Sequence, residues 1–299
     1  MKKYLLSISF LIIALFVLFT LINCGGSDTT TPCIPPKAPT VKTSIKINAG
    51  ESIALTATST EASAAFKWTG PNSYTSTLQN PTIANATEAM AGNYLCTVTV
   101  AGCTSRSDTT LVLIQGVLTD PKDGHVYKTI KIGTQTWMAE NFQWQSPSDY
   151  ADYKVYDGLP ANGPIYGMLY DWILAQKCDD GITGWRLPTQ SDFELMVSYL
   201  GGYLIAGAKL KEAGTGHWAT PNYGATNSSG FTALGGGYYD VINSLGYQDK
   251  NNRAYFWTKT PFQGAIVYFT LRTEDNWSRI EWTTVSPQCN FYSVRLIKN

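Results

Sequence analysis

This chain of 299 residues has few histidines and no net charge. It contains two histidines, and 22 lysine and arginine residues balance 22 aspartate and glutamate residues. A balanced charge gives no electrostatic attraction toward nucleic acid or an anionic membrane face. No His-Glu-x-x-His, Gly-x-Ser-x-Gly or P-loop spacing occurs in the sequence. The sequence therefore predicts no nucleic-acid partner, and it predicts no catalytic residues.

Charged residues are also few, at 15% of the chain against about 25% in an average soluble protein. Glycine, tyrosine and tryptophan are frequent instead. This balance is typical of β-rich, loop-rich extracellular domains rather than of cytosolic enzymes. At 299 residues, the chain has room for two domains of ordinary size.

Residues 1–23 resemble a lipoprotein signal peptide. Lys2 and Lys3 precede an apolar run without charge from Tyr4 to Ile22, and Cys24 follows. We expect Cys24 to carry lipid, and burial of its acyl chains at roughly 0.8 kcal/mol per CH₂ would anchor the chain to the membrane. An uncleaved transmembrane anchor is the alternative, because an apolar run of this length can span a bilayer. Both alternatives place the rest of the chain outside the cytoplasm.

Composition divides the remainder into three segments. Residues 24–40 are rich in Ser, Thr, Pro and Gly, which predicts a flexible tether. Residues 41–115 hold short alternating strands between Gly, Pro and Asn, which predicts a β-sandwich. Residues 117–299 hold a helix pattern over Ser191–Leu200, with Glu194 at capping-box spacing, among loops and short strands. The predicted fold class is mainly β with an α+β head, and no strand is expected to cross the boundary.

The first of these domains resembles an immunoglobulin-like sandwich. Trp68 stands where the buried tryptophan of strand C belongs, and Tyr94 precedes Cys96 by two residues, as in a tyrosine corner. The cysteine of strand B is missing, and Ala57 stands in its place. We therefore expect Cys96 to be a buried free thiol, and the domain to act as a spacer.

Six ordered blocks mark the second domain. These are Trp137–Asn141, Tyr166–Trp172, Gly184–Thr189, Gly224–Phe231, Tyr255–Trp257 and Phe291–Arg295. In this order and spacing they resemble the Fibrobacter succinogenes major paralogous domain, a module of bacterial cell-surface lipoproteins. The resemblance implies a C-type-lectin-like fold, a scaffold mostly used for binding, and names no ligand. The same fold hosts formylglycine-generating oxidases, but those use a close pair of cysteines near the C-terminus, where Cys289 stands alone.

With Cys24 lipidated, five cysteines remain in an oxidising compartment, so they cannot all pair. If Cys96 is buried, Cys33 and Cys103 are left to close the first domain.

Cys178 and Cys289 are then the pair left in the second domain. They flank the Gly184–Thr189 block and the final strand, which lie side by side in lectin-like folds. The resemblance places the family's late cysteine where this chain has Leu296, so the pairing requires a shifted loop.

Eight of the nine tryptophans fall in the second domain. Tryptophan faces stack on sugar rings or seat side chains of a protein partner, although those inside the six blocks are expected in the core. Outside the blocks, the segment 273–284 mixes aromatic and hydrogen-bonding residues, and strand alternation there could instead bury Trp282. The candidate ligand-binding residues are Trp144, Trp277, Trp282, Glu274 and Asn276.

No cofactor or metal is expected. Sugar-binding C-type lectins hold calcium with a Glu-Pro-Asn or Gln-Pro-Asp loop and a Trp-Asn-Asp strand, and neither occurs here. Calcium stays open at Asp179–Gly181 or at Glu274–Trp277, whose oxygen ligands suit hard cations.

The sequence predicts a lipid-anchored protein of the bacterial cell envelope, at the outer membrane or cell surface. Its predicted partners are membrane lipid through Cys24 and an extracellular polysaccharide or protein, bound without catalysis. A structural or assembly module of the envelope is one alternative, and a hydrolase of unknown chemistry is another. A pocket lined by aromatics would favour binding, whereas two carboxylates about 5–9 Å apart in a cleft would favour hydrolysis.

Overall fold

The computed structural model describes residues 33–147, 152–243, 245–283, 286 and 288–299. Cys24 and residues 1–23 lie outside these ranges, so the signal peptide and the lipid attachment stay predictions. Within these ranges, no helix is long and apolar enough to cross a membrane. Strands dominate and the helices are short, which confirms the mainly β fold class.

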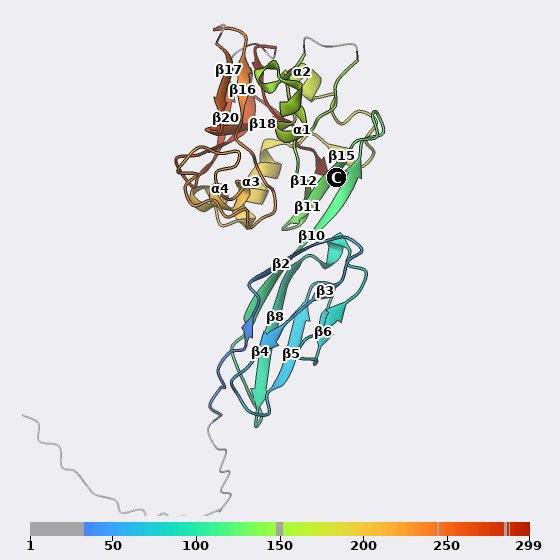
Figure 1. The fold of residues 1–299 in the computed structure, drawn as a ribbon, viewed down its shortest axis with the longest axis vertical. Helices are drawn as coiled ribbons and strands as arrows, with labels where there is room; N and C mark the ends of the chain where they lie inside the picture. The colour runs from blue at the N-terminus through green and yellow to red at the C-terminus, as the bar shows by residue number, and fades with distance from the viewer. Residues whose placement is uncertain (1–32, 148–151, 244, 284–285, 287) are drawn as a thin grey trace, which may run out of the picture. The chain divides into compact units, whose positions relative to one another are not determined.

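The first domain is built from one large sheet and two smaller ladders (Figure 1). Its strands are β1 (Thr40–Val41), β2 (Ser44–Asn48), β3 (Ile53–Ala54), β4 (Ala57–Thr58), β5 (Ala65–Gly70), β6 (Tyr74–Ser76), β7 (Thr82–Ile83), β8 (Gly92–Val100), β9 (Cys103–Thr104) and β10 (Asp108–Thr119), with a 3-10 helix η1 (Glu88–Met90). In the large sheet, β10 runs antiparallel to β8 and parallel to β2. β8 pairs in turn with β5, while β1–β4 and β3–β7 form the smaller ladders.

The signature residues occupy the places expected for an immunoglobulin-like domain. Trp68 is fully buried and pairs across the ladder with Cys96. The hydroxyl of Tyr94 donates to the carbonyl oxygen of Met90 at 3.0 Å, which is the tyrosine corner. Ala57 is buried where strand B would carry its cysteine. The immunoglobulin-like prediction for the first domain is confirmed.

The cysteines of this domain also follow the prediction. Cys33 and Cys103 are disulfide-bonded, and Cys96 is a free, buried thiol. Burial raises the pKa of the Cys96 thiol to about 11, so the group stays protonated and packs as a small apolar side chain.

Strand β10 crosses the expected domain boundary, which corrects the expectation that no strand does so. Its first half pairs with β8, and its second half, Gln115–Thr119, pairs antiparallel with β11 (Val126–Ile132). Gly116 does not end the strand. A glycine stands there because the Glu88 carboxylate lies so close to the backbone that a Cβ would overlap it. Buried and exposed residues alternate through it into the second domain.

The second domain extends the first sheet and adds a second one. Its further strands are β12 (Gln135–Met138), β13 (Tyr153–Val155), β14 (Met168–Tyr170), β15 (Trp185–Arg186), β16 (Gly236–Asp240), β17 (Gly246–Lys250), β18 (Arg253–Phe262), β19 (Ala265–Arg272), β20 (Ser278–Thr283), β21 (Asn290–Phe291) and β22 (Ile297–Lys298). Its helices are η2 (Tyr156–Gly158), η3 (Pro160–Asn162), α1 (Gly163–Tyr166), α2 (Trp172–Ala175), α3 (Gln190–Tyr199) and α4 (Tyr203–Leu210).

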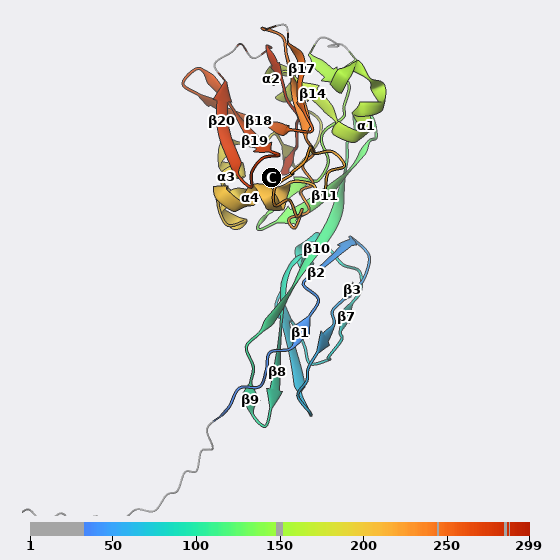
Figure 2. The same ribbon diagram turned by 60° about the vertical axis from the view of Figure 1, so that its left-hand side comes forward.

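Strand pairing brings distant segments of this domain together. β22 pairs with both β12 and β15, so the end of the chain lies beside the Gly184–Thr189 block, as the resemblance implies. The second sheet has the order β17-β16-β18-β19-β20, and β21 also pairs with β16. Figure 2 labels β17, β18, β19 and β20 of this sheet. The pair β16–β18 is parallel, whereas β18–β19 and β19–β20 are antiparallel.

The helix expected over Ser191–Leu200 is α3, and its cap differs in detail. Thr189 is the N-cap, and Asp192 rather than Glu194 completes the capping box. Arg186 grips the same carboxylate through hydrogen bonds of 2.6 and 2.8 Å. This bidentate ion pair explains why Asp192 rather than Glu194 completes the capping box, because it holds the Asp192 side chain at the start of the helix.

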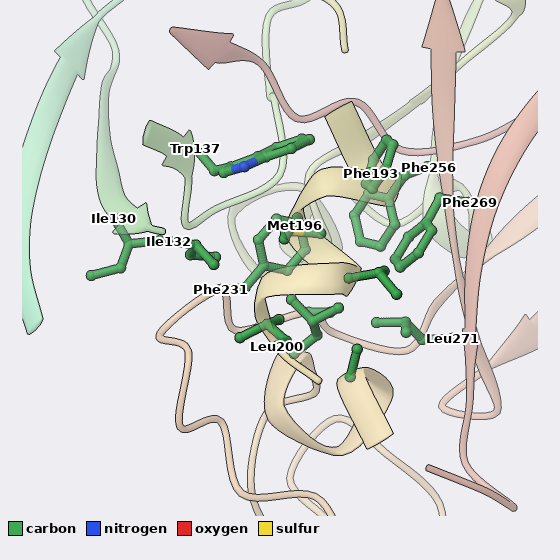
Figure 3. Packing of buried hydrophobic residues seen from close by; sticks show 14 of the residues in the cluster. Ile130, Ile132, Trp137, Phe193, Met196, Leu200, Phe231, Phe256, Phe269 and Leu271 are labelled. Carbon is green, nitrogen blue, oxygen red and sulfur yellow. The ribbon is translucent and has the colours of Figure 1, made fainter. Parts of the chain in front are cut away.

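An aromatic core joins α3 to both sheets (Figure 3). The Phe193 ring lies 4.9 Å from that of Trp137 on β12 and stacks at 4.4 Å on that of Phe269 on β19. Phe231 and Phe256 complete the cluster. Of the tryptophans expected in the core, Trp137, Trp185 and Trp257 are buried and Trp172 is half-buried.

The expected disulfide between Cys178 and Cys289 is absent, since both are free thiols. Cys178 is fully buried, and its sulfur lies 3.6 Å from the carbonyl oxygen of Leu174. Cys289 is half-buried beside β16, where its carbonyl accepts the Val241 N–H at 2.9 Å. The prediction is wrong because the final segment places Leu296, not a cysteine, in the core cluster around Cys178.

Candidate ligand-binding site

A cavity of about 290 Å³ opens on the second sheet, and tyrosines form much of its wall. We call it the tyrosine pocket, after Tyr238, Tyr255, Tyr268 and Tyr292. Its polar lining residues in the described part of the chain are Asp240, Asn243, Arg253, Thr283 and Asn290.

The register of the second sheet brings these rings together. Tyr255 and Trp257 are two residues apart on β18, so they project to the same face. Tyr268 on β19 pairs directly with Trp257. Tyr292, which follows β21, stacks on Tyr255 at 5.0 Å and lies 4.9 Å from Tyr268. Tyr238 on β16 closes the group, 5.0 Å from Tyr255.

The four tyrosines divide into a floor and a rim. Tyr255 and Tyr292 are buried, whereas Tyr238 and Tyr268 are half-buried and present ring surface to the cavity. Burial raises the pKa of all four hydroxyls above its ordinary value. Each therefore stays protonated at neutral pH and can both donate and accept hydrogen bonds.

The polar groups around the rings are held in fixed positions. The Tyr255 hydroxyl donates to Asp249 Oδ2 at 2.6 Å, and Arg253 lies 3.6 Å from the same oxygen. The Asp240 carboxylate accepts the backbone N–H and the side-chain amide of Asn243, both at 2.9 Å. These contacts orient one cation and one carboxylate toward the pocket before any ligand arrives.

Acid–base catalysis finds little support in this pocket. Asp240 is the one carboxylate among the described residues that line it, and both its oxygens already accept hydrogen bonds. Hydrolysis of a glycosidic bond needs a pair of carboxyl groups flanking the bond. The described lining residues therefore do not supply this pair.

The turn after β16 adds an apolar edge. Val241, Ile242 and Leu245 are 46%, 50% and 56% exposed, and Ile242 lines the pocket. An exposed apolar group beside a pocket is typical of a binding surface.

Of the predicted binding segment 273–284, residue 284 lies outside the described residues, and the described side chains are only partly exposed. Trp277 is 47% exposed, and the Arg279 guanidinium lies 5.1 Å from its ring. Glu274 is exposed, 4.0 Å from the nearest arginine nitrogen. The backbone carbonyl of Asn276 accepts the Ala208 N–H of α4 at 3.2 Å, and its side-chain Oδ1 is buried without a hydrogen-bond partner among the described residues.

The other two candidate tryptophans are Trp144 and Trp282. Trp144 is half-buried, with the Lys122 ammonium 4.3 Å from its ring. The backbone of Trp282 pairs with Val267, and its side chain lies outside what the structure describes.

The predicted binding segment and the tyrosine pocket have one described residue in common, Thr283. Thr283, at the end of β20, lines the pocket, whereas Trp277 precedes the start of that strand. A strand of this length spans roughly 20 Å, so Trp277 and the pocket cannot contact one sugar unit together.

Sequence reasoning missed the four tyrosines. Tyr255 and Tyr292 lie inside the framework blocks, whose aromatic residues are assigned to the core, and Tyr238 and Tyr268 lie outside them. One available signal was the spacing of Tyr255 and Trp257, which places both rings on one face of a strand.

Metal ligands are not gathered in the described part of the chain, where no group of three or more His, Cys, Asp or Glu side chains could hold an ion. Asp179, one of the residues considered for calcium, accepts the Leu187 N–H at 3.0 Å and so stabilises a turn. Calcium binding remains untested.

Three solved structures with immunoglobulin domains are similar to the chain at low scores. The Ig1 domain of mouse SynCAM 2 is 12% identical, covering 27% of this chain and 97% of that chain, with a TM-score of 0.24. Dpr2 Ig1-Ig2 in complex with DIP-Theta Ig1-Ig3 is 15% identical, covering 36% and 45%, with a TM-score of 0.25. The N-terminal four Ig domains of Dscam1 isoform 4.4 are 16% identical, covering 29% and 28%, with a TM-score of 0.22. Nothing about function follows from scores this low.

No curated protein matches the chain. The family model of the Fibrobacter succinogenes major domain matches residues 130–298, which include all six sequence blocks. The match does not test the lectin-like architecture, which stays a prediction. Since the matched residues make up more than half of the chain, the protein belongs to the Fibrobacter succinogenes major domain family.

Proposed function

We propose that this protein is a lipid-anchored binding protein of the bacterial cell envelope, and that it holds an extracellular polysaccharide in the tyrosine pocket. The observation that carries the proposal is the gathering of four tyrosines around one cavity with a fixed arginine and a fixed aspartate. The protein binds without catalysis, and the first domain acts as a spacer between the membrane and the site.

A sugar ring matches this pocket in two ways. Its C–H face can pack on the half-buried rings of Tyr238 and Tyr268, because aromatic faces combine apolar area with a polar edge. Its hydroxyls both donate and accept, and so do the tyrosine hydroxyls, while Arg253 donates and Asp240 accepts. The volume of about 290 Å³ is near the lower end for small-molecule sites, which suits one or two units of a longer chain.

The anchor proposal rests on Cys24 and on the disulfide. The bond between Cys33 and Cys103 ties the chain to the sandwich, so residues 24–32 are left as the proposed tether. Replacing Cys24 by Ser should abolish acyl labelling in cells and leave an unprocessed precursor. A Cys24→Ser protein of mature size that still carries label would exclude lipidation at this residue.

A glycan array probed with the full-length protein tests the binding proposal, followed by calorimetry on the best ligand. Tyr238→Ala and Tyr268→Ala should each weaken binding by roughly 1–3 kcal/mol, as expected for aromatic contact residues. Tyr239→Ala is the matched control, because this half-buried tyrosine neighbours Tyr238 on β16 but packs on Tyr247 and Phe291 instead. Chelation by EDTA should leave the affinity unchanged.

Three outcomes count against the proposal. An array without a single bound glycan would remove polysaccharide as the ligand class, and a protein ligand would then be the alternative to pursue. Equal losses in Tyr239→Ala and Tyr238→Ala would show that binding fails through stability rather than contact. Loss of binding in EDTA would assign a role to calcium.

A further inference from the structure

A second cavity, of about 370 Å³, lies elsewhere in the second domain. It shares no lining residue with the tyrosine pocket and contains five ionisable side chains. We call it the Arg295 cavity. The ionisable residues are Lys128, Glu140, Glu212, His217 and Arg295.

Arg295 is buried and forms no ion pair with a carboxylate of the described residues, although the charge of Glu140 acts on it. Its side chain is inside the protein with 1% of the residue exposed, and no carboxylate of the described residues lies within 4 Å of its guanidinium. It donates to Asn141 Oδ1 at 2.8 Å and to the carbonyls of Phe231 and Thr232. The rings of Phe231 and Phe256 lie 4.2 and 5.4 Å from its central carbon. These partners orient the cation, but none of them neutralises it.

A residue with a strained backbone, Thr232, accepts a hydrogen bond from the Arg295 guanidinium. Thr232 has a φ of 56°, a conformation that β-branched residues rarely adopt. Asn227 locks it there by accepting its N–H and donating to its hydroxyl, both at 2.9 Å. The strained residue then presents its carbonyl to Arg295 at 2.9 Å. Strain of this kind is often retained at ligand-binding positions.

Charge is unevenly distributed around the cavity. Near Arg295, the Lys128 ammonium lies 2.9 Å from the Glu140 carboxylate, so this side carries more positive than negative charge. Burial alone would raise the pKa of Glu140, but hydrogen bonds from Lys128 and the nearby positive charges hold it below its ordinary value. Glu140 therefore stays ionised and cannot act as a general acid at neutral pH.

The other side of the cavity holds the Glu212 carboxylate. Both oxygens of Glu212 lie 3.0 Å from Nδ1 of His217, whose ring packs edge-on against Tyr166 at 5.6 Å. Pro164, Ile165 and Leu234 add apolar wall, and Ile165 is 44% exposed.

From this arrangement we infer that the Arg295 cavity binds a small zwitterion, an α-amino acid or the terminal residue of a peptide. The ligand carboxylate pairs with Arg295 and Lys128, the ammonium pairs with Glu212, and an apolar side chain rests on the wall around Leu234. A simple anion would meet two carboxylates, and a simple cation would meet two basic groups. Only a ligand with both charges satisfies both sides.

Calorimetric titration of the full-length protein with three small probes tests this inference. Alanine carries both charges, propionate carries the carboxylate alone, and ethylamine carries the ammonium alone. Alanine should bind in the micromolar to millimolar range, and each single-charge probe should bind at least tenfold more weakly. Lys128→Met and Glu212→Gln should each weaken alanine binding at least tenfold.

Matched variants control for charge and folding. Lys131→Met removes a lysine from the same strand, and Glu194→Gln removes a carboxylate from α3; neither residue lines the cavity, so both should bind alanine as the parent protein does. Absence of alanine binding would overturn the inference. So would equal binding of alanine and propionate, or unchanged affinity in both Lys128→Met and Glu212→Gln with melting temperatures preserved.

Discussion

In the first domain, buried polar side chains bond to nearby chain: the Tyr94 hydroxyl reaches a carbonyl four residues away, and the Trp68 ring N–H reaches one 11 residues away. In the second domain, buried cations bond across long separations. The ammonium of Lys211 reaches carbonyls 61 and 64 residues away, and the guanidinium of Arg295 reaches one 64 residues away. The difference follows from the backbone in each region.

Strands satisfy most of their backbone groups through ladders, and in the sandwich side chains complete a few that remain, such as the Ala57 N–H, which donates to Asn80 Oδ1. The loops of the second domain have no ladder, and their buried carbonyls still require donors. Lys211 is fully buried and meets three of them, in Tyr223, Arg272 and Asp275, at 2.8–3.2 Å. A buried cation with several N–H donors therefore substitutes for a ladder where the chain is irregular.

The largest expected effect distinguishes two lysines at the C-terminal end of α4, Lys209 in its last turn and Lys211 at its C-cap. Lys211→Met leaves three buried carbonyls without a donor, so the free energy of unfolding should fall by about 3–5 kcal/mol. Lys209→Met removes the same charge but one hydrogen bond, to the Leu200 carbonyl at 2.9 Å, and should cost about 1 kcal/mol. Urea denaturation measures both. Equal losses would contradict the role given to buried cations.

In the second domain, buried cations such as Lys211 hold distant segments together. In the first domain, the disulfide bond between Cys33 and Cys103 does so. Its reduction should lower stability by about 2–4 kcal/mol, because the bond limits the entropy of the unfolded chain. Thermal melting with and without dithiothreitol measures the loss, and the Cys33→Ser, Cys103→Ser double variant, which should not respond to reductant, is the control. Because β10 belongs to both domains, we expect one transition in each case. A second transition would show that the domains unfold separately.

The same comparison explains what sequence could predict. The tyrosine corner, the buried Trp68 and the strands of the sandwich follow from short motifs and alternation, which are local signals. Lys211 and Arg295 have no such signal, because a lysine or an arginine in a sequence is normally assigned to the surface. Their burial depends on loops that only the folded chain brings together.

The candidate site shows the same limit. The sequence favours segment 273–284 because its residues are adjacent in the chain, whereas the tyrosine pocket draws on Tyr238, Tyr255, Tyr268 and Tyr292 from separate parts of the second sheet and its edge. The boundary prediction failed for a related reason: Gly116 reads as a turn residue, but in the structure it allows Glu88 to approach the strand.

A smaller effect tests whether the local bonds of the sandwich have the modest value of an ordinary hydrogen bond. Tyr94→Phe removes the hydroxyl that reaches Met90, and should lower the free energy of unfolding by about 1–2 kcal/mol. Tyr199→Phe, at a 56% exposed position on α3, is the control and should change it by less than about 0.5 kcal/mol. A loss in Tyr94→Phe as large as that in Lys211→Met would erase the distinction between the two regions.

The smallest expected effect concerns the second domain, which the structure leaves without a covalent bond between Cys178 and Cys289. Cys289→Ser should change the free energy of unfolding by less than about 0.5 kcal/mol, because this residue is half-buried and its thiol is free. Cys178→Ser should cost about 1–3 kcal/mol, because it places a hydroxyl in a closed apolar core. Thiol titration in denaturant should detect both cysteines, together with Cys96. Equal losses from the two substitutions, with neither thiol detected, would establish the disulfide after all and give both domains the same kind of covalent constraint.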